Sequence, residues 1–290
     1  MGWASSREDP AGALRRPTAA DDKYSRGVLG VRTGSDAYPG AAVLGVEAAW
    51  RTGVGMIRYV GPDRPARLVL QRRPETVVGA GRVQAWVIGS GTDAAARSDE
   101  ETAALRGILR GDVPVVADAG SLDLVAGATA PLLVTPHARE HDALRARLGL
   151  GAVAPDADDA EREASARETA RALGGAVLLK GAVTIVVAPD GDAHRVSAGT
   201  PWLATAGTGD VLAGCIGALV AVESARTAVG LAALARLGAA GATLHGRAAR
   251  RAASAHGPQG GPITALDVAE ALPGVVGEAL AAREEPTAGT

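Results

Sequence analysis

A short unit that recurs along the chain constrains the fold more than any other feature. Each copy consists of a short apolar run, a turn rich in glycine and polar residues, and a helical stretch. Strands that alternate with helices in this way predict βαβ units, so we expect an α/β fold with a mostly parallel sheet. The expected strands are 28–31, 56–60, 85–88, 114–117, 132–134, 177–179, 184–188 and 193–196. The expected helices are 39–52, 99–110, 139–148, 158–173, 210–222, 226–253 and 264–280.

The composition fits this fold class and excludes several others. Phenylalanine is absent, although 47% of the residues are hydrophobic. The core must therefore consist of Ala, Val, Leu and Ile, which suits a parallel sheet covered by helices. The formal net charge of −2 argues against a nucleic-acid binder, which should carry a basic excess. A single cysteine, Cys215, excludes a disulfide framework and a cysteine-based zinc site.

A chain of 290 residues is long enough for one large domain. We expect that domain at 23–282, after a flexible leader at 1–22 and before a disordered tail at 283–290. The first residues include acids and lack an apolar core, so they do not resemble a signal peptide. No uncharged apolar run reaches about 18 residues, so no membrane span is predicted. These features favour a cytoplasmic protein.

Ligands bind beyond the carboxyl ends of the strands in open parallel sheets, and this chain places polar and flexible residues there. Several such ends in series indicate one composite site on the rim of the sheet. The strands are followed by Gly34-Ser35, Gly89-Ser90-Gly91, Asp118, His137 and Lys180-Gly181.

The strongest local signal is the segment Gly207-Thr208-Gly209-Asp210, a glycine-rich turn that opens directly into a helix. The free N–H groups in the first turn of a helix form an anion site. Asp210 lies at the same helix start, where it could accept a proton from a hydroxyl that attacks a bound phosphate. The alternative is an ordinary aspartate N-cap, and on the turn alone the two interpretations are about equally supported.

Lys180 is the second signal, because only two of the 30 basic residues, Lys23 and Lys180, are lysines. It ends an apolar strand and precedes Gly181, which would let a ligand approach the backbone. The alternative is a lysine that reaches solvent from the strand end, and the rarity of lysine weakens it. The surrounding sequence is not a Walker A loop.

Two further strand ends carry weaker signals. Taken alone, His137 is better explained as a helix cap, and Asp118 as the first residue of an Asx-turn. The remaining histidines show no paired metal spacing, so no metal-binding residue is predicted. Cys215 is expected to be a small core residue.

In order along the chain, these motifs resemble those of the ADP-dependent (S)-NAD(P)H-hydrate dehydratases, a branch of the ribokinase-like fold. The resemblance covers residues 21–280 and implies a three-layer α/β/α domain around a central, mostly parallel sheet. It rests on Lys23-Tyr24-Ser25-Arg26-Gly27, Gly34-Ser35, Tyr38-Pro39-Gly40-Ala41-Ala42, Gly89-Ser90-Gly91, Val116-Ala117-Asp118-Ala119-Gly120-Ser121-Leu122, Thr135-Pro136-His137, Lys180-Gly181-Ala182-Val183-Thr184 and Leu203-Ala204-Thr205-Ala206-Gly207-Thr208-Gly209-Asp210.

The resemblance implies a hydro-lyase that converts the hydrates (S)-NADHX and (S)-NADPHX back to NADH and NADPH. It would phosphorylate the added ring hydroxyl with ADP, release AMP, and then eliminate phosphate to restore the double bond. Magnesium would accompany the nucleotide, since phosphoryl transfer needs charge neutralisation. Members of the family are often tetramers, so a homo-oligomer is also implied.

The matching positions carry the family's site residues over to this chain. Asp210 corresponds to the catalytic residue, which also contacts the substrate. The other substrate contacts correspond to Ala41, Gly91 and His137. The adenine-nucleotide site corresponds to Lys180, Gly181, Ala182, Val183, Thr184 and Gly209, and the helix-start anion site adds Gly207 and Thr208.

The sequence departs from the family at three motifs and leaves two alternative functions open. Ser90 stands in a Gly-Pro-Gly motif, Arg139 replaces a glycine, and Gly199-Thr200-Pro201-Trp202 replaces a Gly-Asn-Pro-Gly segment. A ribokinase-like, ATP-dependent kinase of a small hydroxylated metabolite or vitamin precursor would share the Gly-Thr-Gly-Asp motif. A nucleotide-binding module without activity is the other alternative, and the intact Asp210 argues against it.

Overall fold

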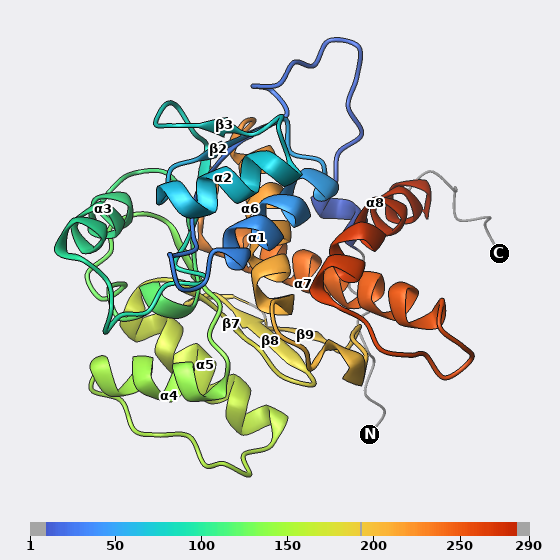
Figure 1. Ribbon diagram of the computed structural model, residues 1–290. Coiled ribbons are helices and arrows are strands. Elements are labelled where there is room, and N and C mark those ends of the chain that lie inside the picture. Colours follow the sequence, from blue (N-terminus) through green and yellow to red (C-terminus); the bar gives the residue numbers. More distant parts are fainter. Residues whose placement is uncertain (1–9, 192, 283–290) are drawn as a thin grey trace.

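A nine-stranded sheet runs through the part of the chain that the computed structural model describes, residues 10–191 and 193–282 (Figure 1). Its strands lie in the order β3-β2-β1-β4-β5-β6-β7-β8-β9. All pairings from β3 to β7 are parallel, and β8 and β9 are added antiparallel. The strands are β1 (Val28–Arg32), β2 (Met56–Tyr59), β3 (Val77–Val78), β4 (Ala85–Ile88), β5 (Val115–Ala117), β6 (Leu132–Val134), β7 (Ala176–Leu179), β8 (Thr184–Val187) and β9 (Ala193–Val196).

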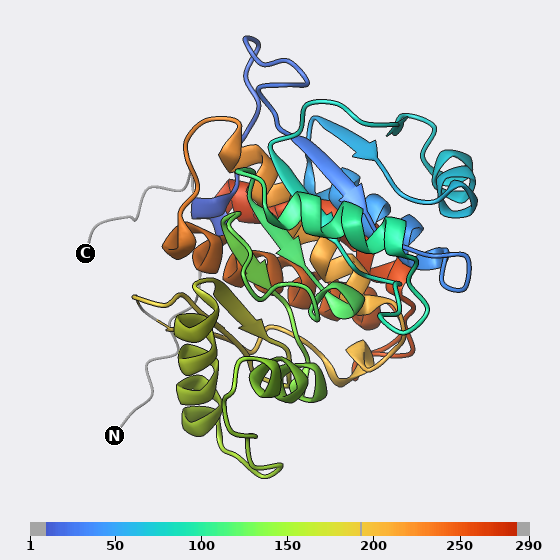
Figure 2. The ribbon, with the colours of Figure 1, turned by 90° about the vertical axis from the view of Figure 1, so that its left-hand side faces the viewer.

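Helices cover both faces of this sheet, as Figure 2 shows from the side. One face carries α1, α6, α7 and α8, with α2 packed on α1, and the other carries α3, α4 and α5. Side chains of a strand point alternately to the two faces, so Val116 joins the first layer and Val115 and Ala117 join the second. The helices are α1 (Gly40–Thr52), α2 (Asp63–Arg72), α3 (Asp99–Leu109), α4 (Ala138–Arg147), α5 (Asp159–Leu173), α6 (Thr208–Ser224), α7 (Leu231–Ser254) and α8 (Ala265–Ala282).

The predicted α/β architecture is therefore confirmed, with strand order reversing at one point. The chain passes from β1 to β2 and β3 on one side, and β4 returns to the other side of β1. Such a reversal leaves a crevice beyond the carboxyl ends of the two central strands, where ligands bind. Here the crevice lies between the segments after β1 and β4, which the Gly34 N–H joins by donating to the Ser90 carbonyl at 2.7 Å.

The ends of the helices follow from local capping chemistry. The Ser98 side chain accepts a hydrogen bond from the Glu101 N–H and so begins α3. Asp158 and Glu161 form a capping box at the start of α5, and Gly174 ends that helix in the left-handed conformation. Thr264 and Asp267 bond reciprocally at the start of α8.

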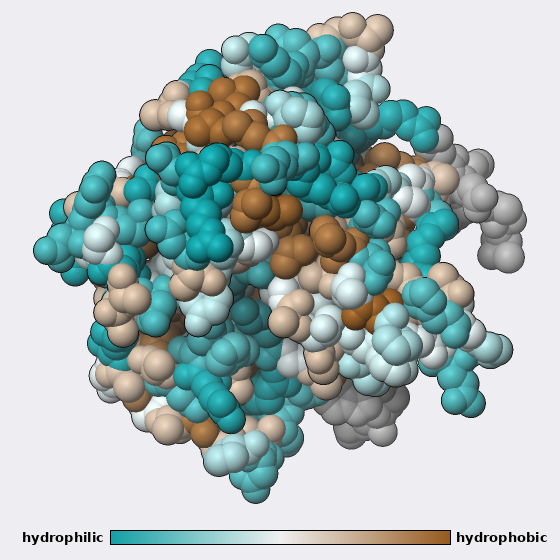
Figure 3. Space-filling view, in the orientation of Figure 1, coloured by the Kyte–Doolittle hydropathy of each residue, from teal (hydrophilic) through white to brown (hydrophobic). Residues whose placement is uncertain are grey.

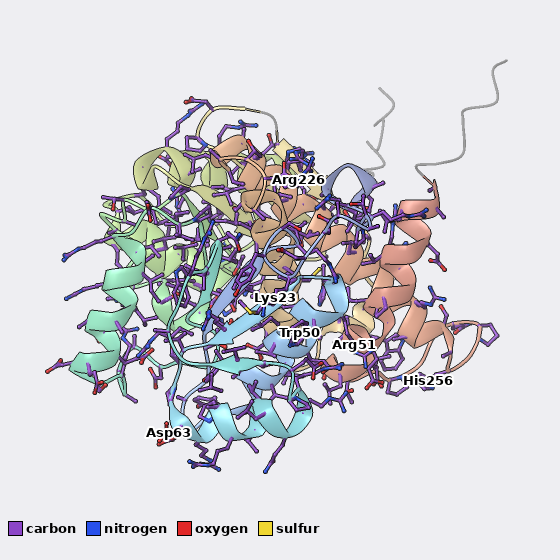
Figure 4. The ribbon with its side chains drawn as sticks, turned by 90° about the horizontal axis from the view of Figure 1, so that it is seen from above. Lys23, Trp50, Arg51, Asp63, Arg226 and His256 are labelled. Carbon is purple, nitrogen blue, oxygen red and sulfur yellow. The ribbon has the colours of Figure 1, made fainter. Side chains whose placement is uncertain are left out.

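A buried carboxylate ties α1 to α2. Glu47 is fully buried, and its carboxylate accepts hydrogen bonds from Arg51, Arg72 and Arg73. Burial raises the pKa of Glu47, but these hydrogen bonds outweigh it and hold the pKa at about 2. Arg72 also bonds Glu270 of α8, and Figure 4 shows Arg51 on the side of α1 toward that helix. The cluster thus clamps three helices on one side of the sheet.

The structure differs from the sequence expectations in several places. Neither α2 nor β3 was expected, α6 begins at Thr208 and not at 210, and α7 begins at Leu231 and not at 226. The two residues of β3 are both exposed, so they have no apolar periodicity to detect; Figure 3 shows a hydrophobic patch in this region of the surface. Pro10–Ala13 were expected in a flexible leader, but they form a turn of 3-10 helix that packs on α7 and α8, with Ala11 fully buried.

The remaining expectations for the ends of the chain lie in part outside the described residues. Residues 1–9 of the expected leader and 283–290 of the expected tail are not described. Within residues 10–191 and 193–282, no helix combines the length and the apolar character needed to cross a membrane.

Candidate active site

The first turn of α6 is built as an anion site at the carboxyl edge of the sheet. Gly207 is the N-cap with a positive φ of 87°, and a Cβ atom there would lie 2.5 Å from a Leu44 methyl. Only glycine fits both conditions. The Thr208 hydroxyl donates to the Thr205 carbonyl at 3.0 Å, and no side chain caps the helix. The first-turn N–H groups therefore face the crevice without a side-chain acceptor from the cap position.

Asp210 is the third residue of α6, so it is not the N-cap that the alternative interpretation required. Its side chain is half-buried. Burial and the nearby negative charge of Asp118 raise the pKa of Asp210 to about 7, and Lys180 acts in the opposite direction. A carboxylate with a pKa close to neutrality is a stronger base than an ordinary aspartate, and near pH 7 both its ionised and its protonated forms are populated.

Lys180 links the end of β7 to the start of α6. Its ammonium nitrogen lies 2.9 Å from Asp118 Oδ1, 3.6 Å from Glu140 Oε2, and 3.8 Å from the position of a Cβ on Gly209. Burial lowers the pKa of Lys180, but the two carboxylates outweigh burial and raise the pKa overall. A fixed positive charge therefore stands beside the anion site, where it can bind a phosphate.

The other lysine does not share this place. Lys23 lies at the opposite edge of the sheet, where its carbonyl adjoins Gly55 just before β2. Its ammonium group stands over the Tyr24 ring, 5.2 Å from the centroid. The rarity of lysine thus pointed to one site residue and to one residue far from the site.

Asp118 is the hub of the site, and the Asx-turn interpretation of this residue is wrong. The residue is 3% exposed and its carboxylate makes no capping bond to the following turn. It accepts hydrogen bonds from Ser90 Oγ at 3.0 Å and Thr135 Oγ1 at 2.7 Å, besides the Lys180 contact. The sequence analysis noted Asp118 and Ser90 at strand ends, and only the order of strands β4, β5 and β6 shows that they meet.

His137 caps α4, as the capping interpretation predicts. Its Nδ1 accepts from the Glu140 N–H at 3.3 Å, and the Glu140 carboxylate accepts from the His137 N–H at 2.8 Å. The imidazole remains 53% exposed. The Glu140 carboxylate also faces the Lys180 ammonium group, so it lies between His137 and Lys180.

Gly91 and Ala41 form the opposite wall of the site. Gly91 has a positive φ of 67°, and a Cβ atom there would overlap the Ala41 methyl group. Ala41 lies in the first turn of α1, and one turn later Gly45 approaches the Asp210 carbonyl; a Cβ on Gly45 would be 3.5 Å from it. Ala41 and Gly91 are therefore in contact, and α1 packs against the helix start that carries Asp210.

The predicted nucleotide segment is the loop from β7 to β8. Gly181 and Ala182 are exposed, and Thr184 is the first residue of β8. Arg162 of α5 donates to the Val183 carbonyl at 3.1 Å and holds the loop in place. The two predicted parts of the nucleotide site, 180–184 and 207–209, meet where Lys180 faces Gly209.

The described residues contain no group of three or more His, Cys, Asp or Glu side chains that could hold a metal ion. In particular, both oxygens of Asp118 are engaged by Ser90, Thr135 and Lys180. The site therefore does not contain a complete protein cage for a cation.

Comparisons with known proteins agree with this geometry. The sequence profile of the NAD(P)H-hydrate dehydratase family matches residues 29–273. A bifunctional NAD(P)H-hydrate repair enzyme of Mycobacterium tuberculosis is 48% identical over 219 residues, which cover 71% of this chain and 43% of that enzyme. The chain thus spans less than half the length of that relative. An ADP-dependent (S)-NAD(P)H-hydrate dehydratase of Neisseria meningitidis is 34% identical over 235 residues, which cover 72% of this chain and 76% of that protein.

A solved structure shows the same architecture. An ADP/ATP-dependent NAD(P)H-hydrate dehydratase of Bacillus subtilis, co-crystallised with ATP and Mg²⁺, superimposes with a TM-score of 0.77 at 25% sequence identity. The match covers 93% of this chain and 96% of that one. A ribokinase-like protein of Enterococcus faecalis, 20% identical with a TM-score of 0.73, agrees in fold.

Proposed function

The chain belongs to the NAD(P)H-hydrate dehydratase family, and from this membership we propose that it converts (S)-NADHX and (S)-NADPHX back to NADH and NADPH with ADP as phosphoryl donor. The observation that carries the proposal is the position of Asp210. A carboxylate with a pKa near 7 stands in the first turn of α6, at the anion site that this helix start forms. Such a group can take a proton from an acceptor hydroxyl while a phosphate is held beside it.

The reaction has two steps. Asp210 removes the proton of the ring hydroxyl, whose oxygen forms a bond to the β-phosphorus of ADP while the bond from that phosphorus to the bridging oxygen breaks and AMP leaves. The ring carbon–oxygen bond then breaks, phosphate departs with the electron pair, and a proton is lost from the neighbouring carbon to give the double bond. Phosphorylation is needed because hydroxide is a poor leaving group and phosphate is a good one.

The residues divide into two sets. We assign the hydrated ring to Asp210, Ala41, Gly91 and His137. We assign the nucleotide to the β7–β8 loop and the start of α6. In this division Lys180 neutralises phosphate charge, and first-turn N–H groups bind phosphate oxygens before the reaction and so require no reorganisation during it. The nucleotide residues are Lys180, Gly181, Ala182, Val183, Thr184, Gly207, Thr208 and Gly209.

Magnesium fits this site as an ion that arrives with the nucleotide. Mg²⁺ commonly keeps several waters and binds phosphates with one or two carboxylates, so it needs no protein cage. Asp210 is the carboxylate that would face the ion, since Asp118 already accepts from three donors. When bound, the ion neutralises charge on the transferred phosphoryl group. The Bacillus subtilis relative crystallised with ATP and Mg²⁺ supports this assignment.

The experiment that tests the function is recovery of absorbance at 340 nm from hydrated NADH, with magnesium and either ADP or ATP. We expect recovery that depends on the nucleotide. No recovery with either nucleotide, in a protein that still binds them, would instead support the metabolite kinase. Because reduced dinucleotides and ADP are intracellular metabolites, we assign the reaction to the cytoplasm. The homo-oligomer that the family resemblance implies stays a prediction, which sedimentation of the purified protein tests.

Two variants test the division of residues. Asp210→Asn should abolish dehydration while nucleotide still binds, and a loss of nucleotide affinity beyond about 100-fold, about 2.7 kcal/mol, would contradict it. Lys180→Ala should chiefly weaken nucleotide binding. Lys23→Ala is the matched control, because Lys23 lies at the opposite edge of the sheet.

A further inference from the structure

Ser90 is buried beside the carboxylate that holds Lys180, and it is not among the residues assigned above to catalysis, substrate or nucleotide. It follows β4 and is 2% exposed. Its hydroxyl donates to Asp118 Oδ2 at 3.0 Å. A side chain that is buried and engaged in this way does not itself meet a ligand. Any effect of the Ser90 hydroxyl on the site must therefore pass through Asp118.

The two oxygens of the Asp118 carboxylate have different partners. Oδ1 accepts from Thr135 Oγ1 at 2.7 Å and from Lys180 Nζ at 2.9 Å. Oδ2 accepts from Ser90, and no other donor bonds it within residues 10–191 and 193–282. The last torsion of an aspartate is broad, so bonds to one oxygen alone leave the plane of the carboxylate free to turn. The bond from Ser90 fixes that plane, and with it the direction in which Oδ1 faces Lys180.

The sheet holds the backbones of these four residues in place. Strands β4, β5, β6 and β7 are neighbours in the sheet. Ser90, Asp118, Thr135 and Lys180 each stand one or two positions after one of these strands. The freedom that remains lies in the side chains, and the long lysine side chain has most of it. The place of the Lys180 ammonium group is therefore set by its side-chain partners.

Loss of the Ser90 hydroxyl would leave Asp118 Oδ2 buried without a donor, which is costly for a charged oxygen. The carboxylate can relieve this cost by turning toward the Lys180 ammonium group, which would then shift. That group lies 3.8 Å from the position of a Cβ on Gly209, so its shift changes the charge at the start of α6. We propose that Ser90 is a positioning residue, which through Asp118 sets the place of the Lys180 ammonium group beside the start of α6.

The rarity of lysine provides the test. Lys23 and Lys180 are the only lysines, so protein labelled with ¹³C at lysine Cε gives two side-chain NMR signals, and Lys180→Ala identifies the one from Lys180. We expect Ser90→Ala to shift the Lys180 signal by more than its line width and to leave the Lys23 signal in place.

Ser121→Ala is the matched control. Ser121 is also fully buried, but its hydroxyl donates to the main-chain carbonyl of Asp118 at 3.0 Å and not to the carboxylate. A Lys180 signal that Ser90→Ala leaves in place, or that Ser121→Ala moves equally far, would overturn the proposal. Ser90→Cys has a weaker donor at the same position and should shift the signal less than Ser90→Ala. If the alanine variant does not fold, a Lys180 signal unmoved in Ser90→Cys overturns the proposal.

The consequence for nucleotide binding rests on the function proposed above. Ser90→Ala should weaken ADP binding, measured by calorimetry without dinucleotide, by about tenfold. In a chain that already carries Lys180→Ala, the loss caused by Ser90→Ala should be at least about threefold smaller, because both changes act on one contact. A smaller reduction would show that Ser90 acts by packing alone and would overturn the proposal. Absence of ADP binding in the parent protein would refute the proposed function, and the NMR comparison would still decide the role of Ser90.

Discussion

Replacing Asp210 by asparagine should make the protein more stable at alkaline pH, because the ionised carboxylate is costly where it lies. The pKa of Asp210 is raised from its ordinary value of 3.8 to about 7 by burial and by the charge of Asp118. Below pH 3.8 both the folded and unfolded chains hold the proton, and the group has no effect on stability. Between pH 3.8 and 7 the unfolded chain loses it first, so stability falls as pH rises, and the full cost persists above pH 7.

The size of the effect follows from the shift. Three pKa units correspond to about 4 kcal/mol, and the partial exposure of the side chain reduces this to about 2 kcal/mol. Asparagine stays neutral and does not incur this cost. The asparagine variant should therefore exceed the parent by about 2 kcal/mol in free energy of unfolding at pH 8, and by little at pH 4. A residue that lowers stability while serving catalysis is a common compromise in enzymes.

Urea unfolding of both proteins at several values between pH 4 and pH 8 measures this difference. The exposed Asp112→Asn variant is the control, and its offset from the parent should not change with pH. If the difference in free energy of unfolding between the Asp210 variant and the parent is constant across this range, the Asp210 carboxyl has an ordinary pKa. The surroundings of the proposed base would then not raise its pKa.

Three further predictions follow from the same contacts. The pH profile of kcat/KM should rise through an apparent pKa near 7, and Asp118→Asn should move this midpoint to lower pH, because a negative charge beside Asp210 is removed; an unmoved midpoint would contradict the interaction. Gly91→Ala should lower kcat/KM by at least about tenfold through overlap with Ala41, and Ala41→Gly in the same chain should restore part of it; equal activity of Gly91→Ala and the parent would refute the close contact. Glu47→Gln should reduce the free energy of unfolding by about 3 kcal/mol in urea titrations, since three arginines lose their buried counter-charge, whereas a loss below about 1 kcal/mol would show that water replaces it.

The sequence predicted the parts of this fold that are buried and repetitive. The expected bounds of β4, β6 and β9 agree with the structure to the residue, because turn residues bound each of these strands sharply. The two exposed residues of β3 carry no such signal. Helix α2 was missed although its buried Pro65, Ala66 and Val69 lie on one face at helical spacing. The packing of residues 10–14 depends on α7 and α8, more than two hundred positions away along the chain, so no local pattern could indicate it.

In the candidate site too, some features could be predicted from neighbouring residues in the sequence, and others depend on tertiary contacts. The turn at Gly207 and the position of Asp210 in the first helical turn could be derived locally, because glycine and a helix start define them. The role of Asp118 could not, since its three partners come from other strands and are brought together by the order of the sheet. From its neighbours in the sequence Asp118 was expected to form an Asx-turn. In the folded chain it instead accepts hydrogen bonds from Ser90, Thr135 and Lys180.

The most direct test of the account follows one oxygen atom. Hydrated NADH carrying ¹⁸O in its ring hydroxyl is converted with ADP and magnesium, and the inorganic phosphate and water are analysed by mass spectrometry. Transfer of the phosphoryl group to that hydroxyl, followed by cleavage of the carbon–oxygen bond, predicts one ¹⁸O atom in every phosphate released. Label found in water, with none in phosphate, would mean that the hydroxyl leaves without being phosphorylated and would contradict the assignment of Asp210 as the base for phosphoryl transfer.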